Sequence, residues 1–137
     1  ITTRTFKLRH ASAVEIAERF NATWSGDFGI AFKIEGTNYL YFKDDEDEQY
    51  FRLMMPAIFA VTEDNEETIM QAMNYVNSNI KVVKLYTMDM EDENGKQETS
   101  VWVAFEIIAD STPELKDIVP RAINLLQGAR IAFLTKL

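Results

Sequence analysis

The side chains that most often carry out chemistry in proteins are scarce in this sequence. His10 is the one histidine, and there is no cysteine, so thiol nucleophiles, thiolate metal sites and disulfides are excluded. A zinc site would need His10 together with two or three carboxylates, and no second histidine stands at ligand spacing. No serine lies in the G-x-S-x-G pattern of a hydrolase nucleophile. We therefore expect His10 to be an exposed or helix-capping residue.

Loops that bind phosphate are also missing. Neither G-x-G-x-x-G nor the Walker pattern occurs, because the five glycines stand at positions 26, 29, 36, 95 and 128. Glycosidases use a pair of carboxylates. The chain has 22 acidic residues, so two of them could lie close together in the fold by chance, and such a pair would not indicate catalysis. We expect no catalytic residue, no cofactor and no metal, and hence a protein that is not an enzyme.

The acidic stretch "MDMEDENGKQE" at 88–98 invites comparison with a calcium-binding loop. Counted from Asp89, an EF-hand would need glycine at the sixth position and glutamate at the twelfth. The sequence has asparagine and serine there, and the flanking residues alternate as strands do. The stretch therefore predicts a solvated hairpin tip, and Asn94-Gly95 favours a two-residue type I′ turn.

A second acidic stretch, "DDEDE" at 44–48, has five consecutive like charges. Such charges repel one another and belong in water. The stretch predicts a hairpin turn whose charges also protect the sheet from pairing edge to edge. The alternative is an electrostatic patch for a basic partner.

Eight segments have the periodicity of regular structure. Apolar residues at helical spacing predict three helices. The first covers 12–20, where Ser12 and Glu15 form a capping box. The second runs from a cap at Thr62 or Asp64 to 77–79, and the third begins at Thr112–Pro113. Alternation predicts a strand over 28–34, and further strands are expected over 39–42, 50–55, 81–90 and 100–109. Residues 57–61 either extend the third strand or lead to the next helix. Pro120 predicts a kink or a helix in two pieces, and 128–137 the frayed end of that helix.

The predicted order is α-β-β-β-α-β-β-α. Strands joined by short polar turns and separated by helices predict an α+β fold, an antiparallel five-stranded sheet with helices packed on one face. No repeat or linker interrupts the chain, so we expect a single domain over 1–137.

Composition limits the classes of partner. The net charge is −8 and the pI about 4.6, and an acidic surface repels nucleic acid and anionic lipid. No apolar run approaches the ~20 residues of a membrane span. We expect no nucleic-acid or membrane partner and, from the missing cysteines, a cytoplasmic location. Because the sequence starts at Ile1, we expect a residue or segment to have preceded it.

The six methionines are the unusual feature of the composition. Most should fill the core, since methionine adapts to irregular gaps. Met54 and Met88 are expected on the sheet face away from the helices. There they would form an apolar patch with aromatic side chains, and this candidate interaction surface consists of Tyr39, Tyr41, Met54, Tyr86, Met88 and Trp102.

The stretch "VNSNIKVVKLYTMDMEDENG" and the apolar "VWVAFEI" that follows resemble the YbjN-like family and the type III secretion chaperone-like fold. In that family the second helix ends in a Val-Asn…Asn stretch, followed by a strand with lysine, an acidic turn with glycine and an apolar strand. Val76, Asn77, Asn79, Lys81 or Lys84, Asp92 and Gly95 stand in those places. The resemblance implies a non-enzymatic domain, and chaperones of this fold are acidic homodimers that hold an extended segment of a client protein.

We therefore expect a protein-interaction domain, chaperone-like or sensory and regulatory, that binds a polypeptide as a homodimer. The alternative is a small-molecule-binding or enzymatic α+β domain with a pocket between sheet and helices. An accessory domain of a larger assembly is a third reading.

Overall fold

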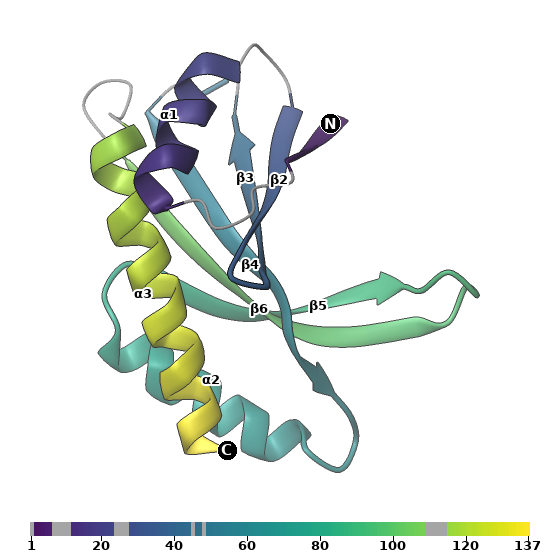
Figure 1. Ribbon diagram of the computed structural model, residues 1–137. Coiled ribbons are helices and arrows are strands. Elements are labelled where there is room, and N and C mark those ends of the chain that lie inside the picture. Colours follow the sequence, from purple (N-terminus) through teal and green to yellow (C-terminus); the bar gives the residue numbers. More distant parts are fainter. Residues whose placement is uncertain (1, 7–11, 24–27, 45, 48, 109–114) are drawn as a thin grey trace.

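The computed structural model describes residues 2–6, 12–23, 28–44, 46–47, 49–108 and 115–137, with nine helices and strands among them (Figure 1). Their order and bounds are β1 (Thr2–Phe6), α1 (Ala13–Thr23), β2 (Phe28–Ile34), β3 (Thr37–Lys43), β4 (Tyr50–Val61), α2 (Glu66–Asn79), β5 (Val83–Glu91), β6 (Gln97–Ile108) and α3 (Leu115–Lys136). The predicted α+β class and the predicted order from α1 to α3 are confirmed. His10, Thr112 and Pro113 lie outside the described residues.

The six strands form one sheet in the order β1-β2-β3-β4-β6-β5. The five predicted strands pair antiparallel, as expected. Strand β1 was not predicted, and it pairs parallel with β2. Its sequence, Thr-Thr-Arg-Thr-Phe, has strand-forming threonines but no apolar alternation, so the pattern gave no signal.

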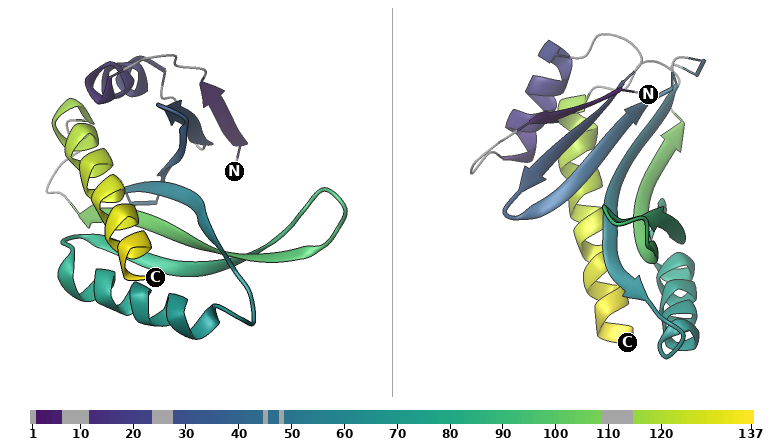
Figure 2. Two further views of the ribbon diagram at one scale, coloured as in Figure 1. Left: turned by 60° about the horizontal axis from the view of Figure 1, so that its bottom comes forward. Right: turned by 90° about the vertical axis from the view of Figure 1, so that its right-hand side faces the viewer.

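All three helices pack on one face of the sheet, as predicted (Figure 2). The main hydrophobic core lies between these two layers and takes in buried residues of α1, α2 and α3 and of strands β2 to β6. Strand residues that face the helices alternate with residues that face away, as the pleat requires. We call the face without helices the outer face.

Ser12 is the N-cap of α1, as predicted, and Glu15 bonds to its hydroxyl. The hydroxyl of Ser12 accepts a hydrogen bond from the backbone N–H of Glu15 at 3.2 Å, and it donates to the Glu15 carboxylate at 3.3 Å. This satisfies one of the N–H groups that a helix leaves unpaired in its first turn. The buried Ile16 and Ala17 then join the main core.

Strand β4 continues through Pro56, which settles the two alternatives for residues 57–61. Its register against β6 shifts between Met55 and Phe59, and Ala57 has φ 46°. A bulge accommodates the proline because its ring cannot donate a ladder hydrogen bond. Helix α2 has Asn65 as its N-cap, so the caps predicted at Thr62 or Asp64 were wrong.

The type I′ turn that was predicted at Asn94-Gly95 occurs instead in another hairpin of the sheet. The tight turn lies between β2 and β3, where Glu35 and Gly36 have φ 47° and 82°, as a type I′ turn needs. The β5–β6 hairpin has a longer loop, in which the N–H of Gly95 donates to the carbonyl of Asp92 at 3.1 Å. Only Gly95 has a positive φ there, so the predicted two-residue turn was wrong. The Asp92 carboxylate explains the difference because it accepts from the N–H of Asn94 and of Lys96, both at 2.9 Å.

Helix α3 is a single helix through Pro120, so of the two alternatives for Pro120, a kink or a helix in two pieces, the second was wrong. Its last two turns were expected to fray. Instead, Ala129 and Phe133 are fully buried, and the Phe133 ring lies 6.0 Å from that of Phe59. The end of α3 is therefore part of the main core, and packing against β4 holds it in place.

Candidate functional site

A second apolar cluster lies on the outer face of the sheet, and it consists of strand residues only. Met54, Trp102 and Ala104 form its buried centre, with 3%, 6% and 0% exposure. Four half-buried side chains pack around them as a rim: Leu40, Phe42, Tyr86 and Met88. We call these seven residues the outer-face cluster.

Strand register brings the cluster together from four strands. Leu40 of β3 stands opposite Met54 of β4, which stands opposite Ala104 of β6. One step along, Tyr86 of β5 stands opposite Trp102. Because residues two apart share a face, the outward positions of neighbouring strands converge at this point of the sheet.

Tyr86 of the rim contacts two residues of the buried centre. The rings of Tyr86 and Trp102 lie 6.5 Å apart, and the Tyr86 hydroxyl lies 3.3 Å from the sulfur of Met54. The indole N–H of Trp102 is buried and has no acceptor in the described part of the chain. The indole ring is therefore held in the centre by packing and apolar contact and not by a hydrogen bond of its N–H.

A charged network borders the cluster on the same face. The Glu106 carboxylate lies 2.7 Å from the Lys84 ammonium and 3.9 Å from Nε of Arg52, and it accepts a hydrogen bond from the Tyr50 hydroxyl at 2.6 Å. Arg52 also donates to the Tyr86 hydroxyl at 3.1 Å. Two cations thus share one carboxylate beside the apolar rim.

These contacts shift two pKa values. Burial, together with the hydrogen bond to the Glu106 carboxylate, raises the pKa of Tyr50 to about 12. Partial burial raises the pKa of Glu106, but the hydrogen bonds and charges of its neighbours outweigh burial and leave the pKa lowered. The carboxylate is therefore charged at neutral pH, and the network is intact there.

The lowered pKa of Glu106 predicts a pH dependence of stability. The stabilisation is fully present above the ordinary pKa of 4.5 and is lost as pH falls through the lowered value in the folded state. Glu106→Gln should therefore lower the urea midpoint at pH 7 and leave it unchanged once the pH is below both values. Glu93→Gln, an exposed change of the same charge at the hairpin tip, is the control. An equal urea midpoint for Glu106→Gln and the parent at pH 7 would mean that the network adds no net stability.

Four of the six residues predicted for the interaction surface lie in the outer-face cluster: Met54, Tyr86, Met88 and Trp102. The other two were placed on the wrong face. Tyr39 and Tyr41 face the helices, where Tyr39 stacks on Phe32 at 5.3 Å and accepts a hydrogen bond from Gln127 at 3.1 Å. Burial raises the pKa of both tyrosines, that of Tyr41 to about 12.

Leu40, Phe42 and Ala104 complete the cluster and were not predicted. Residues 39–42 are all apolar or aromatic, so alternation alone could not tell which pair faced the helices. Gly29 gave a signal for Phe42. A Cβ at Gly29 would lie 3.0 Å from the Phe42 ring, so the glycine leaves room for that ring on the outer face.

Comparison with known proteins gives one informative likeness. No family model matches the sequence, and no curated protein matches it either. A search of solved structures finds the crystal structure of "YbjN, a putative transcription regulator from E. coli", with a TM-score of 0.53 and 11% sequence identity over 93% of each chain. The chain has a YbjN-like fold. At this identity the likeness concerns the fold alone.

Asn77 lies in the stretch that resembles the YbjN-like family, and it has a structural role in this fold. Asn77 in the last turns of α2 bonds the edge strand β5, where its amide accepts from the N–H of Leu85 at 2.8 Å and donates to the Leu85 carbonyl at 3.1 Å. The side chain thus supplies the two hydrogen bonds that a neighbouring strand would make. Asn79 bonds the carbonyl of Tyr75 within the helix at 2.8 Å.

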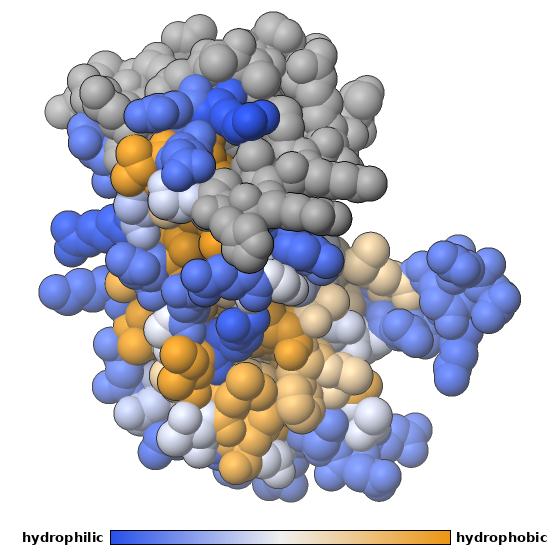
Figure 3. Space-filling model, viewed as in Figure 1, coloured by the Kyte–Doolittle hydropathy of each residue, from blue (hydrophilic) through white to orange (hydrophobic). Residues whose placement is uncertain are grey.

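The acidic hairpin tip of this fold projects as an arm away from the helices, and Figure 3 shows its surface as hydrophilic. A polar groove of about 1,020 Å³ lies between the arm and the start of α2, with Glu63, Glu66, Asp89 and Glu98 among its lining residues. In the described ranges, no three histidine, aspartate or glutamate side chains are placed to hold a metal ion. No helix of the described chain is long and apolar enough to cross a membrane.

Proposed function

We propose that this chain is a non-catalytic interaction domain that holds a segment of another polypeptide against the outer face of its sheet. The observation that carries the proposal is the outer-face cluster, which lies on a sheet face that none of the described helices covers. Apolar side chains gathered on such a face are typical of protein-binding sites.

The rim of the cluster is the part that a partner would contact. The centre is already buried, whereas Leu40, Phe42, Tyr86 and Met88 are half-buried and keep apolar surface in water. Aromatic rings offer large contact areas at low entropic cost, and a methionine adapts its shape to the bound chain. These properties suit a short apolar segment.

The charges beside the cluster favour binding of a different polypeptide over binding of a second copy of this chain. The chain carries a net charge of −8, but beside the cluster Arg52 and Lys84 share a single carboxylate. The Lys84 side chain is 58% exposed, so it can pair with an acidic residue of a partner. Two copies meeting face to face would bring these excess cations together. The expected occupant is an apolar segment with an acidic residue.

Site-specific photo-crosslinking in the native cell tests the proposal. A photoreactive amino acid at position 88 should join an apolar, acidic segment of another protein, which mass spectrometry would identify. The control places it at position 70, because Met70 is 54% exposed on α2. A synthetic peptide of the captured segment should bind about tenfold more weakly to Met88→Glu, since a charge would be buried against it, and equally well to Met70→Glu.

Two results would count against this assignment. Equal capture at positions 88 and 70 would show that the outer face has no special role. Capture of a second copy of the chain at position 88, with a matching dimer in light scattering, would replace the foreign segment by the homodimer that the family resemblance implies.

A further inference from the structure

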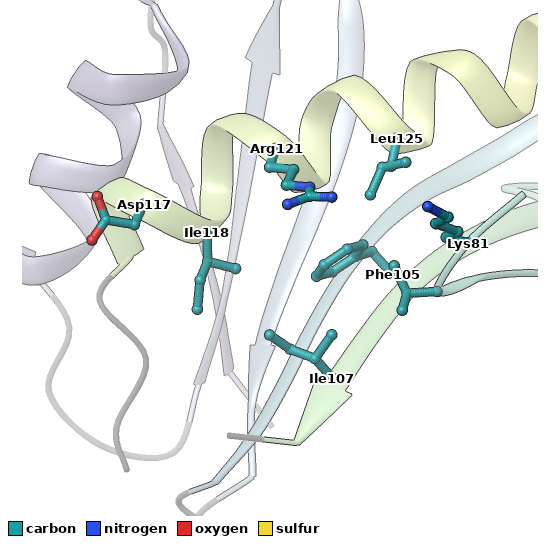
Figure 4. Close-up of a pocket in the computed structure, with 8 residues that line it drawn as sticks. Lys81, Phe105, Ile107, Asp117, Ile118, Arg121 and Leu125 are labelled. Carbon is teal, nitrogen blue, oxygen red and sulfur yellow. The ribbon is translucent and has the colours of Figure 1, made fainter. Parts of the chain in front are cut away.

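A separate cavity of about 360 Å³ lies between α3 and the sheet, on the helix side (Figure 4). Phe105 and Ile107 of β6 and Ile118 and Leu125 of α3 point into it. Val82, just before β5, completes the apolar wall. The volume is at the small end of the ~300–1,000 Å³ typical of ligand sites.

The deep side of the cavity is the main core itself. Phe105 is only 4% exposed, and its ring packs edge-on against Phe51 with centroids 5.9 Å apart. Ile107, Ile118 and Leu125 are half-buried, each with one side against the core. Water cannot form hydrogen bonds with apolar walls of this kind. An apolar group that displaces the water would therefore bind there favourably.

Two cations flank the apolar space. The exposed Lys81 and Arg121 approach it from the loop before β5 and from α3 (Figure 4). Neither has an ion-pair partner among the residues that the structure describes, where the ion pairs involve Arg52 and Lys84. Asp117 also lines the cavity, but its carboxylate points away from the apolar side chains (Figure 4).

The backbone beside Lys81 is strained. Val82 has φ 52°, a conformation that β-branched residues rarely adopt, and its carbonyl accepts a hydrogen bond from the N–H of Glu106 at 3.4 Å. Strain of this kind persists where the surroundings hold the chain in place, and it is common at binding sites. Here the hydrogen bond from Glu106 helps to hold the turn that places Lys81 at the edge of the cavity.

We infer that this cavity binds a small amphipathic carboxylate, with its apolar body against Phe105, Ile118 and Leu125 and its head group between Arg121 and Lys81. A planar carboxylate matches the forked donors of a guanidinium, and the lysine adds a second charge. The size of the cavity limits the body to a short acyl chain or a single aromatic group. This is a small-molecule function in addition to the polypeptide site on the outer face.

Titration with decanoate, kept below its micelle concentration, tests the inference. Methyl NMR should show saturable shifts at Ile107, Ile118 and Leu125, while Leu40 on the outer face stays unchanged. Calorimetry should show about tenfold weaker binding for Arg121→Gln, since a hydrogen bond to a charged group is lost. Decan-1-ol has the same body without the charge, and it should bind Arg121→Gln and the parent equally.

Lys96→Gln is the matched control because it removes one positive charge at the hairpin tip, away from the cavity. It should leave decanoate binding unchanged. The inference is overturned if no saturable shift appears, if the shifts occur at Leu40 instead, or if Lys96→Gln weakens binding as much as Arg121→Gln does. Since Arg121 is exposed on α3, its substitution should leave the fold intact, and none of these results depends on a polypeptide partner.

Discussion

Phe133→Ala is expected to lower the free energy of unfolding by about 3–5 kcal/mol, the range for a large aromatic side chain removed from a core. Phe133 is four residues from the end of the sequence, where chains often fray. In this fold it is fully buried and packs on Phe59 of β4. Urea denaturation followed by circular dichroism measures the change.

Leu134→Ala is the matched control for this effect. Leu134 is adjacent in sequence and 44% exposed, so its truncation should change the free energy of unfolding by no more than about 0.5 kcal/mol. Similar small values for both variants would mean that the end of α3 is detached from the sheet in solution.

The second large effect is expected at the centre of the outer-face cluster. Trp102→Ala should cost about 3–5 kcal/mol of unfolding free energy, because it leaves a cavity among Met54, Ala104 and Tyr86. Trp102→Phe should cost only about 1–2 kcal/mol, since the buried indole N–H has no acceptor in the described chain to lose. The difference between the two variants measures packing alone.

Met90→Ala provides the comparison on the same face. Met90 is 48% exposed further along β5, and its truncation should change stability by about 0.5 kcal/mol or less. If Trp102→Ala were equally mild, the seven side chains would be loosely associated in solution, and the outer face would be an ordinary solvated surface.

Periodicity predicted most of this fold because most of its signals are local. The strand at 28–34 alternates in the sequence as it does in the sheet, and the capping pair at Ser12 and Glu15 acts within one helical turn. Such features depend on near neighbours in the chain. They could be read without knowledge of the tertiary structure.

The errors occurred where distant parts of the chain decide the outcome. Tyr39 and Tyr41 stand in an apolar run, and only their pairing with β2 and β4 determines which face they take. The parallel partner of β1 lies across a helix. The cavity beneath Arg121 depends on how α3 packs against β6, which no local pattern contains.

The clamp that Asn77 makes on Leu85 limits how the sheet can grow sideways. Every second residue of an edge strand turns its N–H and carbonyl outward, so beyond Leu85 the open positions of β5 are Thr87, Asp89 and Glu91. Two of these three carry negative charge, and a second molecule laid along them would meet its own like charges. Two features therefore oppose the pairing of two β5 strands. The Asn77 amide already occupies the hydrogen-bonding groups of Leu85, and the negative charges of Asp89 and Glu91 repel those of a second copy. The β5 edge of the sheet is therefore protected against pairing with the β5 edge of a second molecule.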